Sequence, residues 1–297
     1  MARRKKGSPV HGWLILDKPL GATSTQALGA VKRIYDAQKA GHAGTLDPLA
    51  TGMLPIFLGE ATKFLQHVLS ARKAYRTTIA FGTETATADR EGEVVASAPL
   101  PTASRADVDL VLTRFVGRIR QRPPAYSAIK RDGVPLYKLA RQGEVVEAPE
   151  REVQIQRIDV LACSPEALEI EVVCGSGTYI RSLGVDIGRA LGSVAHLSAL
   201  RRLWVSPFET AEMVELESLN ECVDPAACVL AIDQAMPQFA PLALEEAELA
   251  ELKFGRVVAG RAEAEARYRL YAVDGTFVGL GLVREGVLRV DRLMATG

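Results

Sequence analysis

Alternation of apolar and polar positions predicts several β-strands along the chain. The clearest case is residues 73–81, where Tyr75, Thr77, Ile79 and Phe81 share one face. Shorter apolar runs bounded by glycine, proline or aspartate also have the composition of strands. These runs cover residues 12–16, 153–161, 167–174 and 200–205.

Apolar residues at helical spacing lie between these strands. Thr23 can cap a helix whose apolar stripe falls within residues 28–35. Because strands and helices interleave irregularly and hairpin signals recur, an α+β fold suits the sequence better than a strictly alternating parallel sheet. The other expected helices are residues 60–70, residues 104–115 and a helix from Thr178 that Gly192 ends.

The C-terminal end has the pattern of a small β-rich module. The dipeptides at 274–275 (Asp-Gly) and 285–286 (Glu-Gly) separate strand-like runs, as type I′ hairpin turns do. Residues 237–241 have the composition of a linker. We therefore predict a main domain at residues 10–240 and a module at 241–297. Residues 1–9, which contain the run RRKK, are expected to form a disordered basic tail.

The composition indicates a chain that can bury a full core without a membrane segment. It has 297 residues, 48% of them hydrophobic, and no apolar run of the roughly 18 residues that a transmembrane helix needs. The basic N-terminus lacks the apolar segment of a secretory signal. Four cysteines without a C-x-x-C pair favour a reduced, cytoplasmic protein with no structural metal site.

The charge is segregated although the formal net charge is zero. Residues 114–141 contain eight cations and one anion, Asp132, whereas residues 209–252 contain eleven acids and no cation. This distribution is typical of an electropositive face for a polyanion with an acidic far side. The alternative is a set of ordinary solvated helix faces.

Residues 41–55 (GHAGTLDPLATGMLP) are the most distinctive stretch. Its glycines and prolines argue against a regular helix or a central strand, so we expect a shaped loop. Asp47 is the single carboxylate in the loop, and Pro48 follows it. Asp47 is either a turn residue that bonds its own backbone or a reactive group, because a carboxylate on a rigid, half-buried loop can serve as nucleophile or base.

Four ordered blocks resemble the TruB family of tRNA pseudouridine synthases. The similarity spans residues 10–215, and the C-terminal hairpins resemble the small PUA-type RNA-binding module of that family. The resemblance implies a pseudouridine-synthase fold, with a mixed, largely antiparallel central sheet flanked by helices. The blocks are residues 16–24 (LDKPLGATS), 41–55, 122–141 (RPPAYSAIKRDGVPLYKLAR) and 175–183 (GSGTYIRSL).

Three residues carry the chemistry that the resemblance implies. Asp47 would be the catalytic aspartate, and Arg181 would pair with it. Tyr75 would pack on the target base and handle its C5 proton. Taken alone, Tyr75 has the pattern of a core aromatic and Arg181 that of a helix-surface arginine, so their assignment depends on the ordered blocks.

Further residues would contact the RNA substrate or shape its pocket. His42 would enter the space that the target base leaves, although a lone histidine between glycines is more often a turn residue. The sequence departs from the family pattern at Ala43, where threonine is frequent, and at Ala86, where an aspartate is common nearby. The substrate-binding set is completed by Tyr179, Leu200, Lys18 and Lys130, of which Lys18 would brace the loop from behind.

The resemblance implies an enzyme that isomerises uridine 55 in the T loop of tRNA. The base must be flipped into a pocket, where an ionised carboxylate can attack it or its sugar. No external group is transferred, so no cofactor is expected. We expect a cytoplasmic monomer of the bacterial stand-alone type, with tRNA as partner and no obligate protein partner or guide RNA.

Two other functions were weighed against this prediction. An aspartyl phosphatase would need further carboxylates to hold Mg²⁺, and no second acid lies near Asp47 in the sequence. A non-catalytic RNA-binding protein could use the same basic face. The joint presence of Asp47, Tyr75 and Arg181 argues against it.

Overall fold

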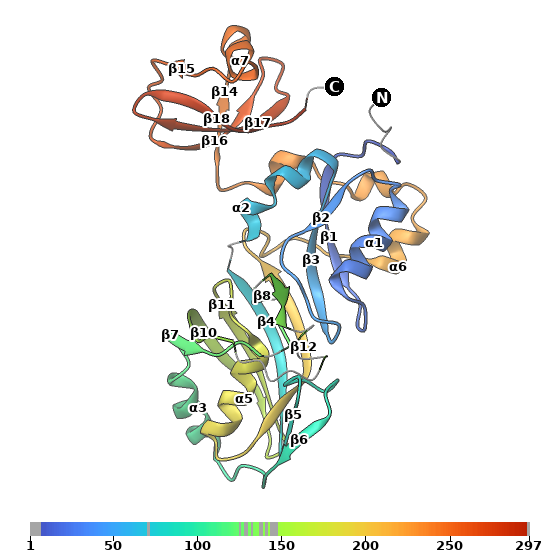
Figure 1. The fold of residues 1–297 in the computed structure, drawn as a ribbon, viewed down its shortest axis with the longest axis vertical. Coiled ribbons are helices and arrows are strands. Elements are labelled where there is room, and N and C mark those ends of the chain that lie inside the picture. The colour runs from blue at the N-terminus through green and yellow to red at the C-terminus, as the bar shows by residue number, and fades with distance from the viewer. Residues whose placement is uncertain are drawn as a thin grey trace.

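The computed structural model describes residues 7–69, 72–124, 126–127, 130–131, 133–136, 139, 142 and 148–295. Within this part of the chain, nine strands form one mixed sheet (Figure 1). Two neighbouring pairs, β1 with β13 and β3 with β12, are parallel, and the other pairs are antiparallel. The strand order is β13 (Val214–Glu215), β1 (Gly12–Lys18), β3 (Ala50–Leu58), β12 (Ala195–Val205), β4 (Lys73–Phe81), β11 (Ala167–Cys174), β10 (Arg151–Cys163) and β7 (Gly117–Gln121), with β2 (Ala40–His42) against β3.

Helices cover this sheet where the apolar patterns predict them. Thr23 caps α1 (Ser24–Ile34) in a capping box with Gln26, and Ser104 caps α3 (Arg105–Thr113) in the same way. Helix α5 (Ile180–Ala190) packs on β12 and β4, and Figure 1 shows it beside α3. The predicted helix at 60–70 is instead a 3₁₀ turn, η1 (Gly59–Phe64), followed by α2 (Gln66–Leu69). The acidic region contributes α6 (Leu216–Glu221), η2 (Pro225–Cys228) and η3 (Ile232–Ala235).

The expected loop at 41–55 is shorter than the sequence suggests, so this prediction was wrong at both ends. Its first residues belong to β2, and residues 50–55 begin the buried strand β3. Pro55 fits inside β3 because its carbonyl accepts the Ala43 amide at 2.9 Å. In an antiparallel strand the N–H and C=O of one residue point to the same side. The Pro55 nitrogen therefore faces Ala43, as its carbonyl does, and the pairing of β3 with β1 does not need an N–H at this position.

The connection at 82–92 is also more ordered than expected. It contains β5 (Thr83–Thr85), which pairs with β6 (Val94–Ser97). A further short pair, β8 (Lys130–Arg131) with β9 (Val134–Pro135), lies in the basic segment. In the predicted tail, residues 1–6 lie outside the described part, whereas Ser8 donates its amide to Asp36 O at 2.6 Å.

The C-terminal module is a β-sheet with one helix, as predicted. Glu285 and Gly286 both have positive φ, 52° and 70°, in agreement with a type I′ turn. The other hairpin has a longer loop, residues 272–276, in which Gly275 has positive φ. The sheet order is β14 (Ala240–Ala243), β16 (Ala266–Tyr271), β17 (Phe277–Arg284), β18 (Val287–Leu293) and β15 (Val258–Ala259), and α7 (Glu246–Lys253) packs against it.

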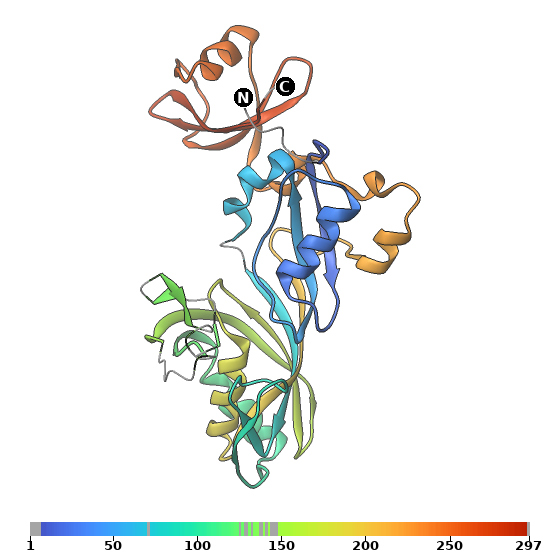
Figure 2. The same ribbon diagram turned by 45° about the vertical axis from the view of Figure 1, so that its right-hand side comes forward.

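Figures 1 and 2 both show this module at one end of the molecule. Its contacts with the larger sheet domain are specific. The rings of Phe64 and Phe277 lie 5.7 Å apart, and the Tyr271 hydroxyl donates to Asp233 Oδ2 at 2.8 Å. Lys63 Nζ donates to Leu293 O at 3.2 Å. The module is therefore attached by side-chain packing and hydrogen bonds as well as by the chain connection at residue 240.

Candidate active site

Five of the predicted site residues line one cavity of about 290 Å³. The loop before β3, strands β4 and β12, and the segment that leads into α5 each form one wall. Parallel pairing of β3 with β12 brings the loop next to β12, and antiparallel pairing brings β4 alongside. The five residues are Asp47, Tyr75, Tyr179, Arg181 and Leu200.

The loop that carries Asp47 is held at its base by two buried polar side chains. Ser24 Oγ accepts the Leu46 amide at 2.8 Å and donates to the Leu46 carbonyl at 3.0 Å. Lys18 Nζ donates to the carbonyls of Ala22 at 2.5 Å and Pro48 at 3.4 Å. Burial lowers the pKa of Lys18 to about 8, against the attraction of the Asp47 carboxylate.

The predicted role of Lys18 in substrate binding needs correction. Its side chain is completely buried, and within the described part of the chain its three hydrogen bonds, to Pro19, Ala22 and Pro48, are to backbone carbonyls. A group without exposed surface cannot contact RNA in this conformation. Lys18 instead supports the residue that follows Asp47, as the bracing role implies.

Arg181 is the cation beside Asp47. Its Nε lies 2.9 Å from Asp47 Oδ2, an ion pair that is not aligned as a hydrogen bond. Its Nη1 donates to Thr87 O at 2.8 Å and its Nη2 to Tyr126 O at 2.9 Å. The Arg181 side chain is 5% exposed and that of Asp47 39%, so the arginine is fixed and the carboxylate is open to the cavity.

A second carboxylate, Asp89, lies on the other side of Arg181. Its Oδ2 is 3.6 Å from Arg181 Nη1, and its Oδ1 accepts a hydrogen bond from Thr87 Oγ1 at 2.5 Å. No second acid lies near Asp47 in the sequence, but the fold brings Asp89 close to it in space. Because a guanidinium lies between the two acids, they form an Asp–Arg–Asp arrangement. Among the described residues, no group of three or more metal-binding side chains is found.

Burial raises the pKa of the Asp47 carboxyl above its usual value, and Arg181 opposes this shift. Asp89 raises the pKa further and Lys18 lowers it. A carboxylate that is partly desolvated is more reactive than one in water, and the guanidinium favours its ionised form. This combination suits a nucleophile or a base.

Tyr75 reaches the cavity from β4 and is 8% exposed. Burial raises the pKa of its hydroxyl, and the charge of the neighbouring Arg202 guanidinium lowers the pKa in part. Arg202 lines the cavity from β12 and is completely buried. Sequence reasoning noted the segment around Arg202 but gave this residue no role.

Besides Lys18, two predicted residues do not line the described walls of the cavity. His42 lies in β2, and its buried Nδ1 has no hydrogen-bond partner in the described part of the chain. Burial and the charge of Arg202 lower the pKa of His42, so it is neutral. Lys130 belongs to β8, and its side chain lies outside the described part, as does much of the segment 122–141.

The expected electropositive face is partly compensated by acids from another strand. Arg118 lies 3.8 Å from Glu152, and Arg122 lies 3.6 Å from Glu150. These acids are distant in sequence and approach because β10 pairs with β7. A local count of charges along the chain missed them.

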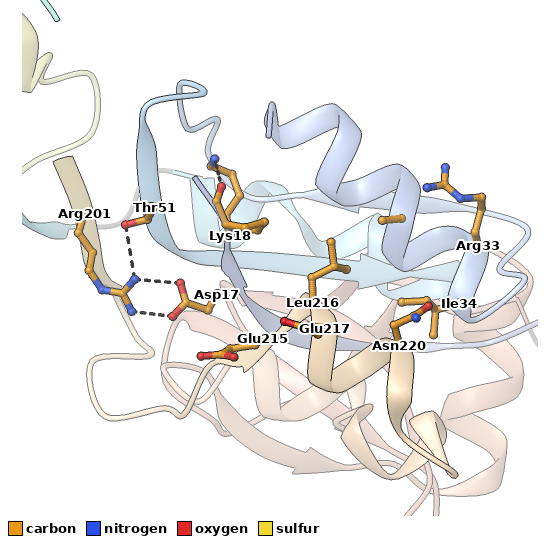
Figure 3. A pocket seen from close by; sticks show the side chains of 12 residues that line it. Asp17, Lys18, Arg33, Ile34, Thr51, Arg201, Glu215, Leu216, Glu217 and Asn220 are labelled. Carbon is orange, nitrogen blue, oxygen red and sulfur yellow. Dashed lines mark hydrogen bonds and ion pairs between the residues drawn. The ribbon is translucent and has the colours of Figure 1, made fainter. Parts of the chain in front are cut away.

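A larger cavity of about 730 Å³ lies elsewhere, between the end of β1, α1 and α6. Figure 3 shows that Asp17 in this cavity is engaged by Arg201 through both carboxylate oxygens, at 2.6 and 3.0 Å. A carboxylate held in this way is a structural anchor. Asp47 in the smaller cavity, by contrast, is 39% exposed, and Arg181 Nε approaches its Oδ2.

The chain matches three family models. Residues 32–180 match the N-terminal domain of the TruB family of pseudouridylate synthases. Residues 181–235 match the tRNA pseudouridylate synthase B C-terminal domain, and residues 240–294 match the C-terminal domain of pseudouridine synthase II TruB. In the described part of the chain, no helix is long and apolar enough to cross a membrane.

Relatives of similar length have the name tRNA pseudouridine synthase B. The chain is 44% identical to the protein of Xanthomonas campestris pv. campestris strain B100 over 290 residues, which cover 96% of this chain and 94% of the relative. It is 42% identical to the protein of Sinorhizobium medicae, over 99% and 98% of the two chains.

Solved structures show the same fold. A Cbf5-Nop10-Gar1 complex contains a chain with a TM-score of 0.72 at 25% identity, over 99% of this protein and 91% of that chain. An H/ACA RNP bound to a substrate RNA gives the same TM-score at 22% identity, over 100% and 92% of the two chains. The family models and the relatives together show that the chain belongs to the TruB family and is a pseudouridine synthase.

Proposed function

We propose that the protein isomerises uridine 55 in the T loop of tRNA to pseudouridine, with Asp47 as the nucleophile. The observation that carries this proposal is the Asp47 carboxylate, open to the cavity and 2.9 Å from the fixed Arg181 guanidinium. The relatives' name, tRNA pseudouridine synthase B, supports tRNA as the substrate.

The reaction exchanges one bond to the sugar for another. The target base is flipped into the cavity, and Asp47 adds covalently to the base or the sugar. The N1–C1′ bond breaks, the base turns, and C5 bonds to C1′. Loss of the C5 proton, gain of a proton from water at N1 and release of Asp47 complete the isomerisation. Atoms are conserved, so the protein acts without a cofactor.

The other predicted site residues keep the roles that the resemblance implies. Arg181 keeps Asp47 ionised until it reacts. Tyr75 packs on the base and is placed to handle the C5 proton, while Tyr179 and Leu200 wall the pocket. His42 enters the space that the base leaves, and Lys130 contacts the RNA.

The protein acts as a cytoplasmic monomer without guide RNA or protein partner. Residues 10–240 form its catalytic domain and residues 241–297 an RNA-binding module. The likeness to Cbf5 at 22–25% identity concerns the fold. The relatives at 42–44% identity are named for tRNA, whereas the more distant Cbf5 chain is named in a complex, and this difference favours the stand-alone function.

Pseudouridine mapping on an unmodified tRNA transcript tests this function. Wild-type protein is expected to convert position 55 without added metal, and Asp47→Asn is expected to bind the transcript without converting it. Conversion at another uridine would reject the target. Conversion that persists in Asp47→Asn would reject the nucleophile but keep the activity.

A further inference from the structure

Arg202 connects two parts of the proposed active site. Its Nε donates to the Met53 carbonyl at 2.7 Å, and its Nη2 donates to the Gly44 carbonyl at 2.9 Å. Gly44 precedes Asp47 in the loop, and Met53 lies in β3 after it. One planar group therefore holds both sides of the loop that carries Asp47.

The guanidinium also reaches Tyr75 on the neighbouring strand β4. Antiparallel pairing sets Arg202 directly opposite Tyr75. The charge of Arg202 lowers the pKa of the Tyr75 hydroxyl, which burial raises, and both side chains line the same cavity. Arg202 thus contacts the loop with the carboxylate and the strand with the aromatic residue.

Gly44 makes the approach of this guanidinium possible. It has a φ of +82°, which disfavours any side chain, and an added Cβ would lie 3.2 Å from Arg202 Nη1. The loop backbone is therefore packed directly against the arginine. A lysine has a single nitrogen and could not reach all these acceptors with the fixed fork of a guanidinium.

Arg202 differs from its neighbour Arg201 in what compensates its charge. Figure 3 shows Arg201 turned toward Asp17, with which it forms a two-oxygen ion pair. Within the described part of the chain, no carboxylate forms an ion pair with Arg202, and Tyr75 is the only group that raises its pKa. A completely buried cation without a counter-ion is unfavourable for folding, which points to a role in the reaction.

We propose that Arg202 is a positioning residue that fixes the Asp47 loop to β4 and orients the Tyr75 hydroxyl toward the bound base. The inference rests on the proposed roles of Asp47 and Tyr75. It adds the group that sets their relative positions. Because Arg202 itself is fully buried, it acts through these two residues and not by touching the substrate.

A double-mutant cycle between Arg202→Lys and Tyr75→Phe tests the proposal. Single-turnover release of tritium from a tRNA transcript labelled at C5 of uridine measures the rate. Arg202→Lys is expected to lower the rate by about 10- to 100-fold, the scale for a small misplacement of reacting groups. Transcript affinity is expected to stay within about twofold, since RNA binding uses other surfaces.

The same substitution in the Tyr75→Phe background is expected to have an effect at least about fivefold smaller, because the hydroxyl that Arg202 orients is gone. Arg201→Lys is the matched control, on the same strand but on the opposite face, and should leave the rate unchanged. The same double-mutant cycle with Arg202→Gln in place of Arg202→Lys removes the positive charge as well as the guanidinium.

Equal effects of Arg202→Lys in both backgrounds would overturn the proposal, as would an unchanged rate. Failure of both Arg202 variants to unfold cooperatively would assign this residue to folding and also overturn it. Tritium release reports isomerisation of any uridine, so an error in the uridine-55 assignment leaves this test valid. Release by Asp47→Asn would identify a failure of the proposed nucleophile separately.

Discussion

The Nε of Arg181 lies 2.9 Å from Oδ2 of Asp47, and the arginine is held there by the carbonyls of Thr87 and Tyr126. The cation cannot follow the carboxylate when the carboxylate moves toward a substrate. Its charge therefore acts as a fixed field on Asp47, which links the ionisation of Asp47 to the groups around Arg181.

Removal of the Arg181 charge should shift the pH dependence of the reaction upward. Arg181 lowers the pKa of Asp47, so Arg181→Gln raises it and protonates Asp47 at a higher pH. We expect the acid limb of the single-turnover rate to move to higher pH, and the maximum rate to fall by about 100-fold or more. An acid limb at the wild-type pH would contradict this assignment.

Substitution of Asp89 should shift the acid limb of the rate in the direction opposite to that of Arg181→Gln. Its negative charge raises the pKa of Asp47, so Asp89→Asn lowers that pKa and moves the limb to lower pH. The same transcript and pH series serve both variants. Shifts of the same sign in Arg181→Gln and Asp89→Asn would show that the Asp–Arg–Asp arrangement does not control the ionisation of Asp47.

Asp47 should reduce the stability of the folded protein at neutral pH. Its folded pKa is raised above the ordinary value of 3.8, so the folded state binds the proton more tightly than the unfolded state does. Its contribution to stability is present below that ordinary value and is lost as the pH rises through the folded pKa. Urea unfolding should therefore show wild type losing stability relative to Asp47→Asn as the pH rises above about 4. A gain in wild-type stability relative to Asp47→Asn as the pH rises would show that folding does not raise the pKa of Asp47.

Lys18→Met should weaken the hydrogen bonds that support the base of the Asp47 loop. The change leaves the carbonyls of Pro19, Ala22 and Pro48 without their buried donor. The Pro48 carbonyl keeps the Gly21 amide, whereas those of Pro19 and Ala22 lose a partly buried hydrogen bond. This loss predicts a decrease of about 1–3 kcal/mol in the free energy of unfolding, together with a lower rate. Lys32→Met, at an exposed position of α1, is the control and should change neither quantity appreciably. Equal stability of the two variants would contradict the support role.

The sequence pattern correctly predicted elements that are determined by neighbouring residues in the chain. Strand β4 begins and ends where the alternation at residues 73–81 places it, and the Thr23 cap starts α1. Strand β3 was missed because its glycines and Pro55 have a poor strand composition. Its position is set by pairing with β1, β2 and β12, which no local window contains.

The site shows the same limit. The ordered blocks brought Asp47, Tyr75 and Arg181 together correctly in one cavity. Asp89 and Arg202 were missed because burial of a charged residue depends on tertiary contacts, and their neighbours in sequence are polar or mixed. The signal for Arg202 was its place two residues after Leu200, which did receive a role.

The packing of α5 provides a further prediction, because this helix carries Arg181 at its start. A Cβ added to Gly188 would lie 2.5 Å from the Ala195 Cβ and 3.1 Å from the Ala195 backbone nitrogen. Backbone on β12 cannot move aside as the end of a flexible side chain can. Gly188→Ala should therefore push α5 away from the sheet and cost about 1–3 kcal/mol in unfolding free energy.

The displacement should also reduce the rate, since it moves Arg181 relative to Asp47. Gly29→Ala in α1 is the matched control, because its nearest neighbour would be the flexible end of Arg33 at 3.7 Å. Replacement of a helical glycine in open space should stabilise the protein by about 0.5–1 kcal/mol without a change in rate. Urea unfolding and single-turnover rates of both variants test whether the packing of α5 positions Arg181. If the two changes alter stability in the same direction, close contact of α5 with β12 does not position Arg181.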